Sequence, residues 1–235
     1  MRTKEFLSAR GVVYESINVA EDERGLQQLR VLGARSVPVV SNGNSFVYAQ
    51  DLNEISRFVG LDYRVSPELP AEILVGRLAN VIDTASVLIQ QIPSNCLQDK
   101  LPGRDRTYLA LANHIFEIAG GFLQVAGGAD FTGSIAMAVP REERTPNELN
   151  AFGRSIISDL NEWWMSCSDP SCVLHVTTFY GPQTLHAVLE RCTWHATQHV
   201  RQVVMILTMH DVEPDRPLTA ADLAGLPLPD GVWDG

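Results

Sequence analysis

The sequence predicts an α+β protein of two domains, a mixed α/β segment over residues 1–62 and an all-α four-helix bundle over residues 72–235. Three observations support this division. Short helical and extended patterns alternate in the first segment, and the stretch 63–71 contains Pro67 and Pro70 and is typical of a linker. Four long amphipathic segments follow the linker. A chain of 235 residues is long enough for one large or two small domains.

The first segment is expected to contain short helices and strands separated by turn signals. Gly11 and Gly33 end the first two helices, and Asn42-Gly43 marks a hairpin turn. Asp51 is expected to cap the last helix, with Glu54 completing a capping box. The predicted helices cover residues 4–10, 23–32 and the stretch after Asp51, and the predicted strands cover 12–19, 37–41 and 45–49.

The second segment is expected to contain four long helices, over residues 72–91, 108–125, about 146–165 and 182–210. Pro93 follows the first helix, and Gly127-Gly128 ends the second. Thr145-Pro146-Asn147-Glu148 predicts the start of the third, because it supplies a cap, a proline in the first turn and a glutamate three residues after the cap. Residues 211–235 are expected to lie over the bundle as an extended tail.

The composition limits the partners. Hydrophobic residues make up 45% of the chain and charged residues 20%, as in ordinary globular proteins. The net charge of −10 argues against a nucleic-acid partner, because phosphates require a basic surface. No apolar run approaches the roughly 20 residues of a membrane span, and no apolar signal core begins the chain, so we expect no membrane association. Four cysteines do not make a disulfide scaffold, and we expect a cytoplasmic protein.

His195 and His199 form the most informative pair in the chain. Two imidazoles four residues apart on a helix point the same way, which suits two ligands of one metal ion. Buried polar groups need partners, and a metal ion is one such partner. An isolated pair of this spacing is more often packing or surface than a metal site. The apolar residues on the same flank, which place the pair toward a core, are Leu185, Leu189, Cys192, Val203 and Ile206.

Residues 3–61 resemble a glutaredoxin-like domain of the thioredoxin fold. The resemblance rests on Thr3-Lys4-Glu5-Phe6-Leu7, Ser36-Val37-Pro38-Val39-Val40 and Gln50-Asp51-Leu52. It implies that Val37 and Pro38 form the cis-proline loop, whose backbone pairs with the cysteinyl part of glutathione. It also implies that Gln50 and Asp51, at a helix start, bind the γ-glutamyl end.

The family has a first strand and a Cys-Pro-x-Cys motif that this chain lacks, because no cysteine precedes Cys96. We therefore expect a truncated domain without dithiol chemistry. Two explanations stay open: a start site placed too late, or a degenerate domain used for binding or docking. A missing central strand would leave a sheet edge that must be covered or paired.

Residues 72–235 resemble the DinB-like bundle family. The resemblance rests on Ala112-Asn113-His114-Ile115-Phe116-Glu117, on the segment from Trp194 to Gln202, and on the ending from Pro217 to Pro229. It implies that His114, His195 and His199 bind a divalent metal and leave open positions for water or substrate. Zinc suits three imidazoles, and nickel, iron or manganese is also compatible with these ligands.

Three further residues are candidates for catalysis, and each has a plainer interpretation. Arg201 could hold an anionic substrate or lie at the solvent edge of its helix. Cys192 could be a fourth ligand, a reactive thiol or simple packing. Glu117 could orient a ligand or be a solvated glutamate.

Other polar and aromatic residues are assigned plain roles. Cys167 and Cys172 resemble a loop thiol pair whose spacing fits a zinc-binding pair or a disulfide, and two unpaired loop cysteines are the simpler interpretation. His175 has no support as a ligand, and ordinary polar-face positions are expected for His186 and His210. Packing is expected for Trp163-Trp164.

The two resemblances together imply a divalent-metal-dependent glutathione transferase or isomerase that acts on a small electrophile. Some DinB-like proteins resemble thiol-dependent enzymes of this kind, including the mycothiol-dependent maleylpyruvate isomerase type. The expected partners are glutathione, an electrophilic substrate and a second copy of the chain in a homodimer. The alternative is a non-enzymatic metal-binding scaffold or dimerisation bundle with a degenerate docking domain.

Overall fold

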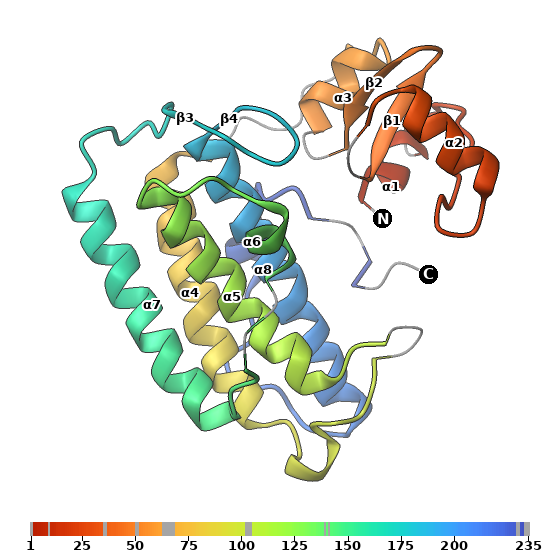
Figure 1. Ribbon diagram of the computed structural model, residues 1–235. Coiled ribbons are helices and arrows are strands. Elements are labelled where there is room, and N and C mark those ends of the chain that lie inside the picture. Colours follow the sequence, from red (N-terminus) through yellow and green to blue (C-terminus); the bar gives the residue numbers. More distant parts are fainter. Residues whose placement is uncertain are drawn as a thin grey trace. The chain divides into compact units, whose positions relative to one another are not determined.

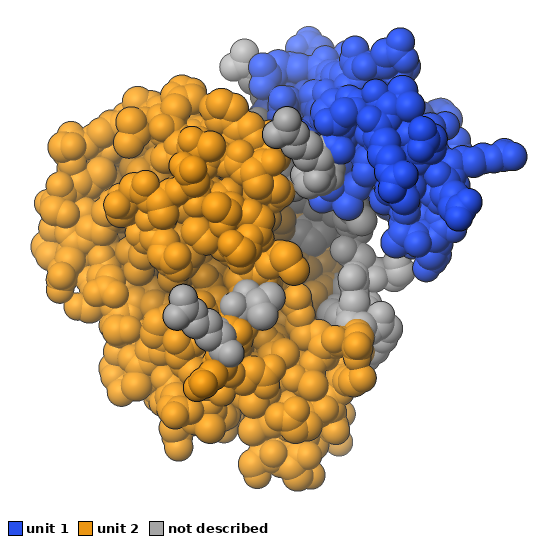
Figure 2. Space-filling view, in the orientation of Figure 1, with its two compact units in different colours: residues 1–68, 234 blue, residues 69–233, 235 orange. Residues whose placement is uncertain are grey.

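The computed structural model describes residues 2–8, 10–34, 37–49, 52–62, 69–101, 105–138, 140, 142–228 and 231–232. Over these residues the protein is mixed α+β and mostly helical, with two small antiparallel sheets (Figure 1). The predicted α+β class is confirmed at this level. Contacts divide the chain into two compact units, here called unit 1 (residues 1–68 and 234) and unit 2 (residues 69–233 and 235), which Figure 2 colours separately.

Unit 1 contains α1 (Arg2–Ser8), α2 (Glu23–Val31), β1 (Val39–Asn42), β2 (Ser45–Tyr48) and α3 (Leu52–Phe58). The strands form a hairpin in which Asn42 pairs with Ser45. The turn is therefore Gly43-Asn44, one residue later than predicted, and Gly43 adopts the positive φ of 60° that the turn requires. The predicted cap at Asp51 lies outside the described residues.

The predicted strand over residues 12–19 is wrong. This segment has no regular secondary structure, and Val13 is 98% exposed. A strand needs a neighbour for its backbone N–H and C=O groups. In the described part of unit 1, β1 and β2 pair only with each other, so their ladder does not reach this segment.

The hydrophobic core of unit 1 lies between α1, α3 and the β1–β2 hairpin. Its buried side chains are Phe6, Leu7, Leu52 and Ile55. The hairpin packs on this cluster through Val40 and Val47, and the residues that pack beside them are Val12, Ala49, Val59 and Leu61.

Unit 2 is built on four long helices, α4 (Ala71–Gln90), α5 (Tyr108–Ala126), α7 (Pro146–Ser166) and α8 (Leu185–Met209). α4 and α5 each pack chiefly against α7 and α8, and Figure 1 shows the four helices running alongside one another. The short elements, which the sequence analysis did not predict, are η1 (Ser94–Cys96), α6 (Gly133–Met137), β3 (His175–Val176), β4 (Gln183–Thr184) and α9 (Ala220–Leu223).

Threonine side chains begin three of the long helices. Thr107 accepts a hydrogen bond from the backbone of Ala110, and Thr184 does the same for Ala187. Thr145 and Glu148 form the predicted capping box, which is confirmed. These caps satisfy backbone N–H groups that have no partner inside the helix. The fourth long helix begins at residue 185 instead of 182 because Gln183–Thr184 forms β4.

α5 corrects the statement, made from the sequence, that no apolar segment approaches the length of a membrane span. Within the described residues it is the one helix, Tyr108–Ala126, whose length and composition suit a membrane span. However, 67% of its most apolar window is buried inside the protein. A buried core helix meets the same criterion, so length and composition alone decide nothing here.

The close approach of α7 to its neighbours depends on Gly153. A Cβ atom at this position would lie 2.6 Å from Ser86 Oγ on α4 and 2.7 Å from Phe116 Cε1 on α5. We expect Gly153→Ala to lower the free energy of unfolding by about 1–3 kcal/mol, because overpacking outweighs the gain in helix propensity. Denaturant unfolding measures the change.

Gly76 on α4 is the matched control, because a Cβ atom there would meet nothing within 4 Å. We expect Gly76→Ala to raise the free energy of unfolding by about 0.5–1 kcal/mol. Equal stabilisation by the two substitutions would contradict the close packing at Gly153.

Candidate metal centre

Three histidines of unit 2 converge from two helices. His114 comes from α5, and His195 and His199 come from α8. The centroid of the His114 ring lies 5.3 Å from that of His195 and 4.8 Å from that of His199, and the two α8 rings are 4.7 Å apart. One ring nitrogen from each residue lies within 4.8 Å of the other two. The structure therefore brings together the three residues that the sequence analysis chose as ligands.

The burial pattern of α8 explains why its two histidines face inward. The apolar residues expected on their flank are all buried, which confirms that prediction: Leu185, Leu189, Cys192, Val203 and Ile206. His114 is itself only 6% exposed. A buried cluster of three imidazoles needs polar partners, because an unpaired polar group costs free energy away from water.

Two of the three rings are oriented by oxygen acceptors. His114 Nδ1 lies 3.0 Å from the backbone oxygen of Ala138, and His199 Nδ1 lies 2.7 Å from Gln202 Oε1. Since these oxygens only accept, each Nδ1 carries the proton, and each Nε2 keeps its lone pair. Proteins commonly fix metal-binding histidines in this way.

The short helix α6 places the carbonyl that orients His114. Ala138 follows α6 in the left-handed conformation, with φ 47° and ψ 47°. α6 begins with Thr132, whose side chain caps Ile135. This helix is therefore part of the support of the site, although no sequence signal assigned it that role.

The spacing of the two α8 imidazoles fits a shared cation. His195 Nε2 lies 3.1 Å from His199 Nε2. Two nitrogens on one zinc ion at about 2.05 Å would lie ~3.3 Å apart in tetrahedral geometry and ~2.9 Å apart in octahedral geometry. Nδ1 of His195 is buried and has no hydrogen-bond partner within the described residues.

Burial keeps the three imidazoles neutral. It lowers the pKa of His114 to about 4 and that of His199 to about 3, and it holds the pKa of His195 well below the usual 6.5. Repulsion between the rings acts in the same direction, because a proton on His199 would disfavour one on His195, and a proton on His114 would disfavour one on His199. Neutral imidazole is the form that binds metal, so the rings can act as ligands at neutral pH.

The three residues that the sequence analysis named as candidates for catalysis are less well placed to act at the histidine cluster than the proposed ligands are. Cys192 is buried, and burial raises its pKa to about 11, which disfavours thiolate. Glu117 forms an ion pair with Arg144 at 2.6 Å. Arg201 donates to Gln198 Oε1 at 2.8 Å and lies six residues after His195, about 240° around α8.

A large cavity begins beside the site. It has a volume of about 840 Å³, and Ala138, whose carbonyl holds His114, is one of its lining residues. Among the described residues that line it, the charged side chains are Arg144 and four glutamates: Glu117, Glu142, Glu143 and Glu148. Sequence reasoning missed this cavity because its residues come from α5, α6, α7 and the segment before α7. Arg201 lines a separate, smaller cavity of about 170 Å³.

The glutathione-binding residues expected in unit 1 are described in part. The Val37-Pro38 peptide bond is cis, as the resemblance implies, and Val37 is 51% exposed. The backbone oxygen of Pro38 accepts a hydrogen bond from Ala49 at 2.9 Å. Gln50 and Asp51 lie outside the described residues.

The remaining histidines differ from one another. His175 is exposed, and His186 Nε2 lies 2.8 Å from the backbone oxygen of Leu69. His210 was expected on a polar face, but it is half-buried and lies against Cys96, with Nδ1 3.8 Å from Sγ.

Cys167 and Cys172 are both free thiols. Burial, followed by the neighbouring Cys167, raises the pKa of Cys172 to about 11. Trp163 packs edge-on against Phe122, with ring centroids 5.0 Å apart, so it has the packing role expected of it.

Comparison with protein-family models, with curated proteins and with solved structures finds no match. The class of the protein is therefore defined by its geometry: an α+β protein whose helical unit holds a buried cluster of three histidines.

Proposed function

We propose that the protein binds a divalent metal ion, with zinc as the first choice, through His114, His195 and His199. The observation that supports this most strongly is the orientation of the rings. Oxygen acceptors hold the Nδ1 atoms of two histidines, and the Nε2 atoms of the α8 pair lie 3.1 Å apart. Unit 2 would then be a DinB-like bundle, since its second long helix supplies one ligand and its fourth supplies the H-x3-H pair.

The function that best suits such a site is a metal-dependent thiol transferase or isomerase that uses glutathione. Three protein ligands leave coordination positions open, and a bound divalent ion would lower the pKa of a thiol placed there. We infer that glutathione supplies this thiol, because unit 1 contains no cysteine and burial raises the pKa of Cys192, three residues before His195, to about 11.

The acidic cavity is the proposed binding site for the electrophile. Its volume of about 840 Å³ lies within the range of small-molecule sites. The described residues that line it carry four carboxylates and one guanidinium, which favours an uncharged or cationic electrophile over an anionic one. The ion pair of Glu117 with Arg144 holds this wall in place, together with the hydrogen bond from Asn113 Nδ2 to the backbone oxygen of Arg144.

Unit 1 is proposed to be glutaredoxin-like and to hold the peptide backbone of glutathione near Val37, Pro38, Gln50 and Asp51. The order of its described elements supports this, because the β1–β2 hairpin follows Pro38 and α3 follows the hairpin. The exposure of Val37 leaves its backbone accessible to a ligand.

The test compares metal-free and zinc-loaded full-length protein. We expect calorimetric titration to show heat of binding for glutathione, and zinc-loaded protein to consume glutathione with chlorodinitrobenzene faster than the uncatalysed reaction. Metal-free protein and the His195→Ala variant should show no such acceleration. The variant His175→Ala is the control, because that histidine is exposed and lies outside the cluster.

A non-enzymatic metal-binding scaffold is the second candidate, and the burial of His114, only 6% exposed, favours it. A closed structural site has no need of an open position. Zinc binding without any heat from glutathione, and without accelerated loss of its thiol, would exclude the transferase and leave the scaffold.

A further inference from the structure

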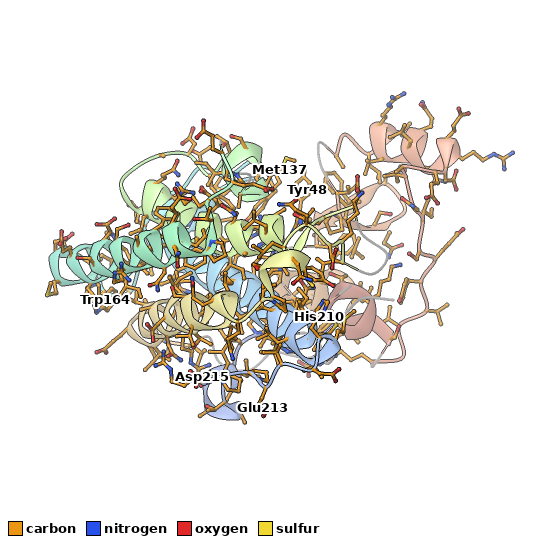
Figure 3. All side chains as sticks on the ribbon, turned by 90° about the horizontal axis from the view of Figure 1, so that it is seen from below. Tyr48, Met137, Trp164, His210, Glu213 and Asp215 are labelled. Carbon is orange, nitrogen blue, oxygen red and sulfur yellow. The ribbon has the colours of Figure 1, made fainter. Side chains whose placement is uncertain are left out.

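We propose that Cys96, Asp99 and His210 form a second metal site in unit 2, which takes a sulfur-binding divalent ion of the zinc class. The ion would tie the connection between α4 and α5 to the end of α8. His210 lies 11 residues after His199, which is about 16 Å along the axis of α8, so the site is distinct from the three-histidine cluster. Figure 3 labels His210 at the end of that helix.

The ligand atoms are close enough to share one ion. One atom from each of the three residues lies within 4.8 Å of the other two. Cys96 Sγ is 3.8 Å from His210 Nδ1. A tetrahedral zinc ion with Zn–S about 2.3 Å and Zn–N about 2.05 Å separates its sulfur and nitrogen ligands by ~3.6 Å. Only a small adjustment of the side chains would therefore be needed.

Backbone hydrogen bonds fix the connection that supplies two of the ligands. Cys96 ends η1, and its carbonyl accepts from the backbone of Asp99 at 2.8 Å. The carbonyl of Asp99 in turn accepts from Tyr108, at the start of α5, at 3.0 Å. His210 caps α8 through bonds to the carbonyls of Ile206 and Leu207. Ligands held on such rigid elements lose little freedom when a metal binds.

Charge and access also suit a cation. A Cys96 thiolate and an Asp99 carboxylate together balance a divalent ion, with His210 as the neutral third ligand. Without a cation, burial and the negative charge of Asp99 raise the pKa of Cys96 and favour the thiol. Asp99 is exposed, so an ion can reach the cluster from solvent.

The imidazole of His210 is poorly satisfied by the protein alone. Its Nδ1 faces the sulfur of Cys96, which is a weak partner. Its Nε2 is buried without a hydrogen-bond partner within the described residues. The ring lies edge-on to Tyr108, with centroids 5.7 Å apart, so it is held in place by packing. A metal bond to this ring would offset the cost of burying it.

Cobalt titration of the metal-stripped full-length protein tests the proposal. Thiolate bound to Co²⁺ gives an intense near-ultraviolet charge-transfer band that imidazole and carboxylate ligands do not give. We expect the wild type to show this band, and Cys96→Ser to lose the band and one equivalent of bound cobalt. Cys167→Ser is the matched control and should keep both, because Cys167 lies outside the cluster.

Two more variants separate this site from the three-histidine cluster. His195→Ala should retain the charge-transfer band. His210→Ala should lower the cobalt affinity, measured by titration of this band, by at least about 10-fold. This second variant keeps the proposal testable if Cys96→Ser does not fold. Absence of the band in the wild type, or its persistence in Cys96→Ser, would overturn the proposal. Loss of the band in His195→Ala would also overturn it, by placing the thiolate at the other cluster.

Discussion

His195→Ala is expected to weaken divalent-metal binding at the three-histidine site by more than about 100-fold. Loss of a residue that merely orients a ligand costs about 10–100-fold, so loss of a ligand should cost more. The remaining two histidines, His114 and His199, come from different helices and would hold the ion weakly. Competition with a chromogenic zinc chelator measures the affinity.

His175→Ala provides the control for this prediction, because it removes an exposed imidazole outside the cluster. Gln202→Ala should fall between the two variants, since Gln202 only orients His199. A His195→Ala protein that binds zinc as tightly as the wild type would show that the three rings do not share an ion.

The metal-free protein is expected to lose stability as the pH falls from about 6.5 to about 4. The buried histidines stay neutral in the folded state, whereas in the unfolded state they take up protons near their usual pKa of 6.5. The unfolded state therefore binds more protons in this window, and acid favours it. The shift of His114 to about 4 alone corresponds to about 3 kcal/mol.

Urea unfolding of metal-free protein at a series of pH values measures this effect. The variant His114→Ala should show a shallower dependence on pH over the same window, because one of the shifted groups is gone. Zinc-loaded protein should lose its metal in this range as protons compete for the imidazoles. A free energy of unfolding that stays constant between pH 6.5 and 4 would contradict the burial of neutral histidines.

The long helices could be predicted from the sequence because their ends have local signals. Thr145 and Glu148 form the predicted capping box, and glycine follows α5 where the end of the helix was expected. The strand over residues 12–19 could not be excluded in this way, since alternation of apolar residues does not reveal whether a partner strand exists. α6 and β4 are too short to give a periodic pattern.

In the candidate metal centre, too, features within one helix could be predicted from the sequence, whereas contacts between residues far apart in the sequence could not. The spacing of His195 and His199 and the apolar flank of α8 are local, and they indicated an inward-facing pair. The role of Ala138 was not predictable, because it depends on a backbone carbonyl 24 residues from His114. Cys96 and His210 are 114 residues apart, and no motif connects them.

α8 supplies two of the three imidazoles of the proposed metal site from one helix, so the affinity of that site for metal would depend on the packing of the whole bundle. A change of one residue in the register of α8 would rotate both rings by about 100° away from His114. The surfaces that prevent this are the contacts of α8 with α4 and α5. Amino-acid changes buried at those contacts, remote from any ligand, should therefore be detectable as weaker ion binding before they are detectable as unfolding.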